Sequence, residues 1–346
     1  FLNEHSIKSI IIDHHEIHQP FPKSDIIINP KKKNGYEQYN DLCATTLTYF
    51  FIDIINKKNK YNFNLQDFLI YVLLATVCDV MPLRHLNRII SINILKNFNI
   101  KKNVPFDILF KLNNKKNKLS IEDLGFLIGP IINSAGRLGK SNLAVELLSS
   151  DNLDLVNRIS NELIRLNNKR KEIEKRIINE IDFKKIKKEN KNVIIYYNPN
   201  INEGLIGIIA SRLKDYFNKP SIVLTKSNNI LKGSARSTNN YNIGNLIKLL
   251  CDKKIIDNGG GHNLAAGLTL KENKIKILDD FIQKDYSNKI LESNNSFLYD
   301  LELSSSAINI KFVNNINKLK PFGNENPLPV FFFKKFKILK SKILDN

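Results

Sequence analysis

Residues 10–22 read IIIDHHEIHQPFP, a short apolar run that leads directly into an aspartate and two histidines. Three isoleucines in a row are typical of a buried strand of a parallel sheet, whose two faces are both covered. The segment IIIN at 26–29 has the same character. Because ligands of open α/β sheets bind beyond the carboxyl ends of the strands, we expect Asp13, His14 and His15 to face a binding crevice.

The composition indicates a soluble protein of two or three domains, with 346 residues, 42% of them hydrophobic and 25% charged. The apolar run FLIYVLLATV at 68–77 is too short to cross a bilayer, so we interpret it as a buried helix and predict no membrane association. Three cysteines without CxxC spacing predict the reducing cytoplasm. The net charge of +19 favours a polyanionic partner, although the coding bias of an AT-rich genome also enriches Lys.

Hydrophobic spacing predicts two α/β units along the chain. In the first, helical patterns follow the two strands at 41–57, 66–78 and 87–97. The SIED segment at 120–123 resembles a capping box that opens a helix ending before Gly129-Pro130. A long charged stretch with apolar residues at helical spacing then predicts a connecting helix over 151–190.

The second unit begins after this helix. Its predicted elements are a strand at 193–197, a helix at 207–217, a strand at 221–225, a strand edge or loop at 232–237, a helix at 243–251, and a strand entered through NGGGHNLAAGLTL. From about 296 the alternating, Pro-rich tail predicts β structure. The predicted domains are therefore 1–150, the helix 151–190, 191–290 and 296–346.

Asp13, His14 and His15 form a possible metal-binding group, because mixed carboxylate and imidazole ligands suit Mn²⁺ and, with more oxygen, Mg²⁺. The alternative is that the histidines are structural turn residues. A second acid, Asp79 in ATVCDVMPL at 75–83, emerges where an apolar helix ends. An unpaired carboxylate is costly there, and a cation would stabilise it.

Three glycine-containing segments are suited to phosphate binding: GPIINSAGRLGKS at 129–141, GSARS at 233–237 and NGGGH at 258–262. Glycines expose backbone N–H groups, and arginine binds phosphate through two parallel hydrogen bonds. Taken singly, each segment is explained as well by a tight turn or a helix end.

In this order, the motifs resemble the DHH phosphoesterase superfamily, and within it the bacterial single-stranded-DNA exonucleases. The resemblance covers nearly the whole chain, and PFGNENPLPVF at 321–331 resembles the segment that leads into an oligonucleotide-binding OB domain. It implies an α/β fold: a DHH phosphoesterase core with a parallel sheet, a long connecting helix, a second smaller DHH-associated α/β domain, and the start of a C-terminal OB-like β domain.

The resemblance also implies roles for individual residues. His14 and Asp79 match metal ligands, and Asp13 and His15 complete the group beside the metals and the scissile phosphate. The positions that match substrate-binding residues are Asn133, Arg137, Ser234, Arg236, Gly260, Gly261 and His262. Such enzymes use two Mn²⁺ or Mg²⁺ ions to activate water and to offset charge on the attacking and leaving oxygens.

The chain departs from the family pattern in three places. Two acidic metal motifs of the family are expected before residue 1, so we expect a fragment that is inactive by itself, the alternative being a degenerate homologue. Asn202 stands where the family usually has histidine, and Ala235 replaces a customary glycine. These last two changes concern only the substrate site.

The predicted function is metal-dependent 5′→3′ hydrolysis of single-stranded DNA in recombination and repair. One alternative is a small DHH phosphodiesterase that acts on short oligonucleotides or cyclic dinucleotides, but the long helix and the OB-like tail disfavour it. The other is a nuclease-dead DNA-binding homologue, which the retained DHH group and Asp79 disfavour. The resemblance further implies a monomer that meets single-strand-binding protein and a helicase.

Overall fold

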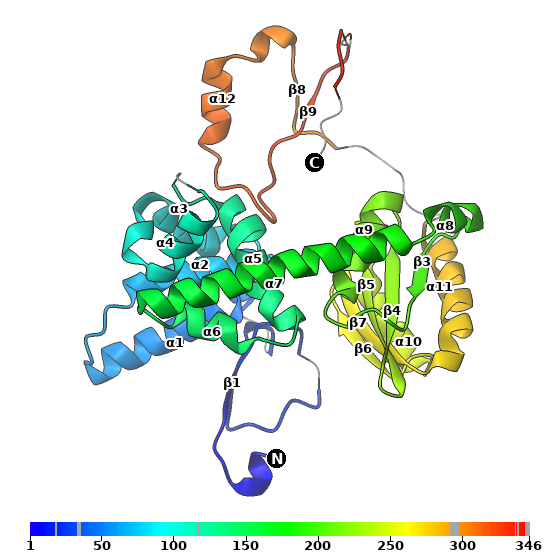
Figure 1. The fold of residues 1–346 in the computed structure, drawn as a ribbon, viewed down its shortest axis with the longest axis horizontal. Helices are drawn as coiled ribbons and strands as arrows, with labels where there is room; N and C mark the ends of the chain where they lie inside the picture. Colours follow the sequence, from blue (N-terminus) through cyan, green and yellow to red (C-terminus); the bar gives the residue numbers. More distant parts are fainter. Residues whose placement is uncertain are drawn as a thin grey trace. The chain divides into compact units, whose positions relative to one another are not determined.

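The computed structural model describes residues 1–17, 19–32, 36–115, 118–290, 298–335, 337 and 339–342. The chain divides into two compact units (Figure 1). Unit 1 contains Phe1–Lys102, Lys116–Gly129 and Ser296–Asn346, and unit 2 contains Asn103–Lys115 and Pro130–Asn295. The predicted domain boundary at residue 150 does not coincide with this division, and the four-domain assignment stays a prediction.

Unit 1 begins with the two predicted strands. β1 (Ile10–Ile12) and β2 (Ile26–Ile28) pair in parallel, with Ile12 beside Ile28. The predicted burial was wrong, because Ile10 and Ile26 are each 48% exposed and the other isoleucines of these strands are only partly buried. The backbone N–H of Asp13 donates to the carbonyl of Ile28 at 3.0 Å, so the pairing extends one residue beyond the strand. The backbone from which the DHH side chains project is therefore fixed by the sheet.

Three helices confirm the predicted helical patterns of unit 1: α1 (Ala44–Asn59), α2 (Leu69–Cys78) and α3 (His85–Asn97). A 3₁₀ turn at Gln66–Phe68 leads into α2. Ile70, Val72 and Leu73 of α2 are at most 1% exposed. Each such side chain contributes about 1.5–3 kcal/mol on burial, so α2 is firmly anchored in the core and its C-terminal end is a rigid support.

The SIED capping box is confirmed, but the helix does not end before Gly129. The Ser120 N–H and hydroxyl donate to the Asp123 carboxylate, and the Asp123 N–H donates to Ser120 Oγ. A π-helical turn (Asp123–Ile128) then runs directly into α5 (Gly129–Arg137). The prediction was wrong because a wide π turn can precede Pro130, where a regular turn would require the N–H that proline lacks.

In unit 2, the predicted connecting helix is two helices, α7 (Leu153–Glu180) and α8 (Phe183–Glu189). Ile181 is extended and 5% exposed, and Asp182 caps α8 by accepting from Lys185 N–H at 2.9 Å. Burial of Ile181 together with this cap breaks the helix. The short helices α4 (Val104–Leu112) and α6 (Asn142–Leu148), which contact α7, were not predicted.

Five strands form the sheet of unit 2: β3 (Ile194–Tyr197), β4 (Ser221–Ser227), β5 (Ile230–Arg236), β6 (Asn258–Gly261) and β7 (Ala265–Leu270). Their order is β3-β4-β5-β7-β6, with β3 and β4 parallel and the other pairs antiparallel. The segment 232–237, predicted as a strand edge or loop, thus belongs mostly to the central strand. Leu231 and Ala235 alternate toward the core, which fits a strand interior.

Helices cover the two faces of this sheet differently. One face packs on α10 (Ile243–Asp252) and α11 (Ile275–Ile290), where Leu246, Ile247 and Leu278 are fully buried. On the other face, α9 (Ile206–Phe217) lies over β4 and β5. Beyond α9, toward β7 and β6, this second face presents glycines and polar side chains. That part of the sheet is where a ligand could approach.

The C-terminal part of unit 1 contains β8 (Leu301–Glu302), α12 (Ile310–Asn317) and β9 (Phe331–Phe332), with β8 and β9 parallel. The tail was predicted as β structure, and α12 corrects this. Residues 336, 338 and 343–346 lie outside the described residues, so the prediction is not tested there. Within the described chain, no helix combines the length and apolarity needed to cross a bilayer.

Candidate metal centre and glycine-lined cleft

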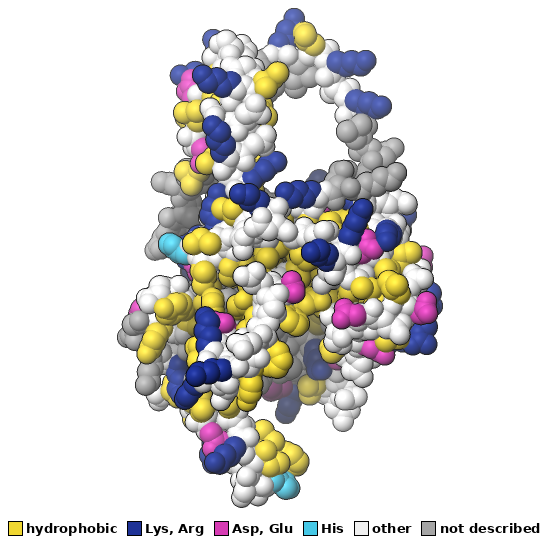
Figure 2. Space-filling model, turned by 90° about the vertical axis from the view of Figure 1, so that its left-hand side faces the viewer, with side chains coloured by type: hydrophobic (Ala, Val, Ile, Leu, Met, Phe, Trp, Pro, Cys, Tyr) yellow, Lys and Arg dark blue, Asp and Glu magenta, His cyan; other side chains and the backbone are white. Residues whose placement is uncertain are grey.

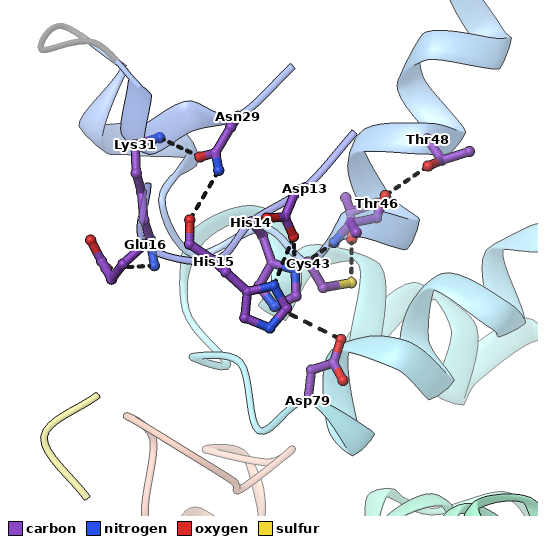
Figure 3. Close-up of polar contacts among 11 residues, drawn as sticks. Asp13, His14, His15, Glu16, Asn29, Lys31, Cys43, Thr46, Thr48 and Asp79 are labelled. Atoms are coloured by element: carbon purple, nitrogen blue, oxygen red, sulfur yellow. Dashed lines mark hydrogen bonds and ion pairs between the residues drawn. The ribbon is translucent and has the colours of Figure 1, made fainter. Parts of the chain in front are cut away.

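The three DHH side chains meet at the carboxyl end of β1 (Figure 3). Asp13, His14 and His15 each offer one ligand atom, and these atoms lie within 4.8 Å of one another. The closest pair is His15 Nδ1 and Asp13 Oδ1 at 2.7 Å. Adjacent residues of a strand point to opposite faces, so their convergence depends on the chain leaving the strand at Asp13.

Asp79 approaches this group from a different element. It is the C-cap residue of α2, and its Oδ2 lies 4.0 Å from His14 Nε2. The backbone N–H of Ala44 donates to His14 Nδ1 at 3.2 Å and thereby orients the ring so that Nε2 faces Asp79 (Figure 3). The structure therefore brings together the four predicted metal-site side chains. We call Asp13, His14, His15 and Asp79 the candidate metal centre.

The protonation states in this centre suit cation binding. Burial lowers the pKa of His14, and the neighbouring His15 lowers it further, while Asp79 and Asp13 partly oppose this. Burial raises the pKa of Asp13, but hydrogen bonds from the His15 ring and from backbone N–H groups outweigh it, and the net pKa is lowered. Neutral imidazole and ionised carboxylate are the forms that bind Mn²⁺ or Mg²⁺. The donor set therefore fits such a cation.

Asn29, which was not predicted, supports the centre from β2. Its side-chain amide donates to the His15 carbonyl at 2.9 Å and accepts from the Lys31 N–H at 2.9 Å. It is only 8% exposed. Asn29 follows β2 as Asp13 follows β1, so the parallel pairing of the two IIIx segments could have predicted its position. His18, which follows the motif, lies outside the described residues.

The turn after Asp79 is strained. The Val80 N–H donates to Val77 and the Met81 N–H to Thr76, the pair of bonds that defines a Schellman helix end. Glycine is usual at the left-handed position of this motif, but here Val80 adopts φ 54°. Such a conformation costs a β-branched residue about 1–3 kcal/mol. The contacts around Val80 must therefore hold Asp79 in place.

Unit 2 contains an open cleft of about 910 Å³. Its lining residues are Gly136, Arg137, Leu138, Gly139, Asn202, Glu203, Gly204, Ile206, Lys232, Gly233, Asn258, Gly259, Gly260, Gly267, Leu268 and Thr269. We call this the glycine-lined cleft. Its cationic side chains are Arg137 at the end of α5 and Lys232 on β5, and Lys232 also pairs with Glu203 at 2.7 Å.

Strand register explains why this surface is hollow. Ser234, Gly267 and Gly260 lie side by side on β5, β7 and β6, and directly opposed residues share one face of a sheet. Because two of the three have no side chain, little side-chain volume covers the sheet along this row, which leaves the surface hollow. The neighbouring row, two residues along, places Lys232 at the wall of the cleft.

Arg137 joins α5 to the loop before α9. Its Nη1 donates to the Gly204 carbonyl at 3.0 Å. A Cβ atom on Gly204 would lie 2.5 Å from the Arg137 carbonyl oxygen, so only glycine permits this approach. Burial lowers the pKa of Arg137, and the nearby Arg170 lowers it further. Such crowding of cations is relieved by a bound anion.

The other predicted substrate residues are placed differently. Arg236 Nη1 donates to Ser234 Oγ at 2.9 Å and to the Ala235 carbonyl, beneath Gly207 in the first turn of α9. Burial and then Arg137 lower the pKa of Arg236. Arg236 and Ser234 thus lie beside the lining residues and face inward.

Besides Ser234 and Arg236, three further predicted residues do not line the cleft. Asn133 and His262 are exposed, and His262 donates its backbone N–H to Ala265 at 2.8 Å in the β6–β7 turn. A Cβ on Gly261 would lie 2.3 Å from the Ala265 carbonyl, which gives Gly261 a structural reason to be glycine. Asn202, which replaces the histidine usual in the family, does line the cleft, and its Oδ1 accepts from Gly204 N–H.

The excess positive charge is not confined to these sites. On the face shown in Figure 2, Lys and Arg side chains are spread over the surface and Asp and Glu side chains are fewer. This agrees with the net charge of +19. A diffuse cationic surface attracts polyanions without selecting a sequence.

Two family models match the chain. Residues 190–288 match the DHHA1 domain, and residues 299–346 match the RecJ OB domain. The first range contains the five-stranded sheet and its helices, and the second contains α12 and β9.

Curated relatives match over nearly the whole chain. The single-stranded-DNA-specific exonuclease RecJ of Haemophilus influenzae is 28% identical over 99% of this chain and 63% of its own length. The RecJ proteins of Escherichia coli and Bacillus subtilis are 28% and 27% identical over 94% and 92% of this chain. The chain spans about 60% of the H. influenzae and E. coli proteins.

Solved structures share the fold. RecJ from Thermus thermophilus in complex with Mn²⁺ aligns with a TM-score of 0.81 at 20% identity, over 96% of this chain and 49% of that chain. An exonuclease RecJ bound to manganese aligns with a TM-score of 0.64 at 20% identity, over 84% of this chain and 73% of that chain. Residues 190–288 are therefore similar to the DHHA1 domain and residues 299–346 to the RecJ OB domain, and the likeness to RecJ extends over nearly the whole chain.

Proposed function

We propose that this protein is a metal-dependent exonuclease that hydrolyses single-stranded DNA in the 5′→3′ direction. The observation that carries the proposal is the convergence of Asp13, His14, His15 and Asp79 from two elements on one centre, with the His14 and Asp79 ligand atoms 4.0 Å apart. Relatives named as single-stranded-DNA-specific exonucleases support the substrate class.

Each residue of the centre has a separate role in this proposal. His14 and Asp79 hold a Mn²⁺ or Mg²⁺ ion, and the Asp13 carboxylate, oriented by His15, faces the same position. When bound, such cations would activate water and offset the charge that develops on the phosphate oxygens. Further acidic motifs, which the resemblance assigns to the region before residue 1, would complete a two-cation site.

The glycine-lined cleft supplies a second function, the binding of backbone phosphates. Arg137 and Lys232 provide positive charge, and Gly260 leaves room for the DNA strand to approach the protein backbone. Ser234 and Arg236 lie beside the lining residues, and Arg236 Nη1 donates to Ser234 Oγ. Contacts of Asn133, Gly261 and His262 with the substrate stay predictions.

The same resemblance extends the proposal to the cellular setting. We propose a cytoplasmic monomer that acts in recombination and repair, together with single-strand-binding protein and a helicase. The diffuse cationic surface supports a polyanionic substrate, since phosphate contacts position nucleic acid without reading its sequence.

The test is a nuclease assay on the protein in its full natural length. Single strands labelled at the 5′ or the 3′ end are incubated with Mn²⁺, with Mg²⁺ or with a chelator. We expect mononucleotide release from the 5′ label first, only with a cation, and little from duplex DNA. Protein that binds single strands but does not cut them with any cation would instead support the nuclease-dead alternative.

A further inference from the structure

A loop of the C-terminal segment packs against the turn that follows Asp79. This loop, Pro321–Asn326 (PFGNEN), lies more than 200 residues from that turn in the sequence but in the same compact unit. A Cβ atom at position 323 would lie 2.5 Å from Leu83 Cδ1, so Gly323 packs closely on this side chain. Leu83 is 2% exposed, so a larger residue at position 323 would require Leu83 to shift within the core.

Asn324 binds the turn at two points. Its side-chain amide donates to the Val80 carbonyl at 2.6 Å, and its own carbonyl accepts from the Leu83 N–H at 2.8 Å. These two bonds span the residues directly after Asp79. Val80 is the residue held at φ 54°, so Asn324 bonds to the strained peptide itself.

Two arginines at the start of α3, Arg84 and Arg88, bind the same loop and the residues just before it. Arg88 Nη2 donates to the Leu319 and Lys320 carbonyls, and its Nη1 donates to the Pro321 carbonyl at 3.2 Å. Arg84 bridges Asp41, at 2.6 Å, and Glu325, at 3.5 Å. A planar guanidinium with several donors is suited to fixing backbone carbonyls in one arrangement. The loop is therefore bound to both ends of the Val80–Arg88 segment.

We propose that the PFGNEN loop is a positioning element for the metal ligand Asp79, acting through Asn324 and the Val80 turn. This inference rests on the proposed metal function of Asp79. Without the bonds from Asn324, the backbone of Val80 would tend to leave its left-handed conformation. That change would turn the end of α2 and move the Asp79 carboxylate away from His14 Nε2. The hydrogen bond from Asn324 opposes that movement. Apparent cation affinity falls in proportion to the fraction of molecules in the competent conformation.

The test measures Mn²⁺ binding directly, by the electron paramagnetic resonance signal of free Mn²⁺, in the protein of full natural length. We expect Asn324→Ala to weaken Mn²⁺ binding about tenfold, the size expected when a group supporting a ligand is lost. The matched control is Asn309→Ala. Asn309 caps α12 by accepting from Phe312 N–H at 2.9 Å and does not contact the turn, so its loss should leave Mn²⁺ binding within about twofold.

A second variant separates positioning from general destabilisation. Asparagine adopts positive φ more readily than valine. Val80→Asn should therefore make the conformation of the turn less dependent on the hydrogen bond from Asn324. We expect Val80→Asn/Asn324→Ala to recover most of the Mn²⁺ affinity that Asn324→Ala loses. Thermal unfolding is followed alongside, because a merely structural role would lower the melting temperature without this recovery.

The outcomes distinguish this proposal from the proposed function. If Asp79→Ala binds Mn²⁺ as the wild type does, the metal centre itself is wrong. If Asp79→Ala loses binding while Asn324→Ala retains it, the metal centre stands and the positioning role is overturned. Equal weakening by Asn324→Ala and Asn309→Ala, or failure of Val80→Asn to restore affinity, would also overturn it.

Discussion

The candidate metal centre and the glycine-lined cleft are built in different ways. In the metal centre, three of the four side chains are consecutive in sequence and follow one strand, and the fourth caps a buried helix. In the cleft, the lining residues come from α5, the loop before α9, and three strands. The centre depends on the chemistry of its side chains, whereas the cleft depends on where the backbone lacks side chains.

This difference has consequences for mutation. Replacing a cation-binding carboxylate by alanine removes its charge but little packing, so it should abolish chemistry while leaving the fold intact. A glycine at a close approach cannot be replaced without moving the backbone, so its removal should affect stability first. Four predictions examine this contrast, beginning with the largest expected effect.

Asp79→Ala should lower the rate of single-strand hydrolysis by more than about 100-fold, beyond what the loss of a supporting group causes. Asp79 is nearly half exposed, so the fold should survive its loss. Binding of single-stranded DNA, measured by fluorescence anisotropy, should change little because it rests on many phosphate contacts. Retained hydrolysis would remove Asp79 from the metal centre.

The reactivity of the Cys78 thiol tests whether the C-terminal end of α2, next to Asp79, is closed. Burial, and then the charge of Asp79, raise the pKa of its thiol to about 11. A raised thiol pKa means less thiolate at neutral pH, a loss that the higher nucleophilicity of the more basic thiolate partly offsets. Alkylation by iodoacetamide should therefore be on the order of twentyfold slower than that of an ordinary cysteine. The rate, followed by peptide mass spectrometry, should rise with pH toward 11. Rapid alkylation at pH 7 would show that the end of α2 is open.

Adjacent glycines of β6 provide a matched pair for the cleft. Gly261→Ala places a Cβ 2.3 Å from the Ala265 carbonyl and should lower the free energy of unfolding by about 1–3 kcal/mol. Gly260 has nothing within 4 Å of the corresponding position, so Gly260→Ala should stay within about 0.5 kcal/mol of wild type. Denaturant unfolding measures both. Equal changes in the free energy of unfolding would mean that packing does not require glycine at position 261.

Arg137→Ala should have the smallest effect. Loss of one phosphate contact should weaken single-strand binding several-fold and flatten the slope of log affinity against log salt by about 0.7. Arg176→Ala, which removes an exposed arginine of α7, is the control with the same charge change. If both variants reduce the slope equally, the cleft has no special role in binding phosphate.

The sequence predicted local features better than those that depend on contacts between distant segments. The positions and parallel pairing of the two strands, α2, α3 and the capping box follow from apolar periodicity and local hydrogen bonding, and all were confirmed. The predicted burial of the two strands was wrong. The break between α7 and α8 depends on burial of Ile181. The continuation of the helix through residue 129 depends on the small size of Gly129, which packs beside Cys78.

The same distinction applies within the candidate sites. The DHH residues are contiguous, so their proximity was accessible from the sequence, and motif order supplied Asp79. The support given by Asn29 to His15, and by Asn324 to the Val80 turn, crosses between segments and leaves little sequence signal. Arg236 was predicted to bind substrate, and its hydrogen bonds to Ser234 and to the Ala235 carbonyl could not be read from the GSARS motif.

The central claim is that Asp13, His14, His15 and Asp79 bind a divalent cation. Crystals of the protein in its full natural length, soaked in Mn²⁺, would test it through anomalous scattering at the manganese edge. We expect a peak about 2–2.5 Å from His14 Nε2 and an Asp79 carboxylate oxygen. A well-ordered centre with no peak there, or manganese bound only elsewhere on the molecule, would contradict it.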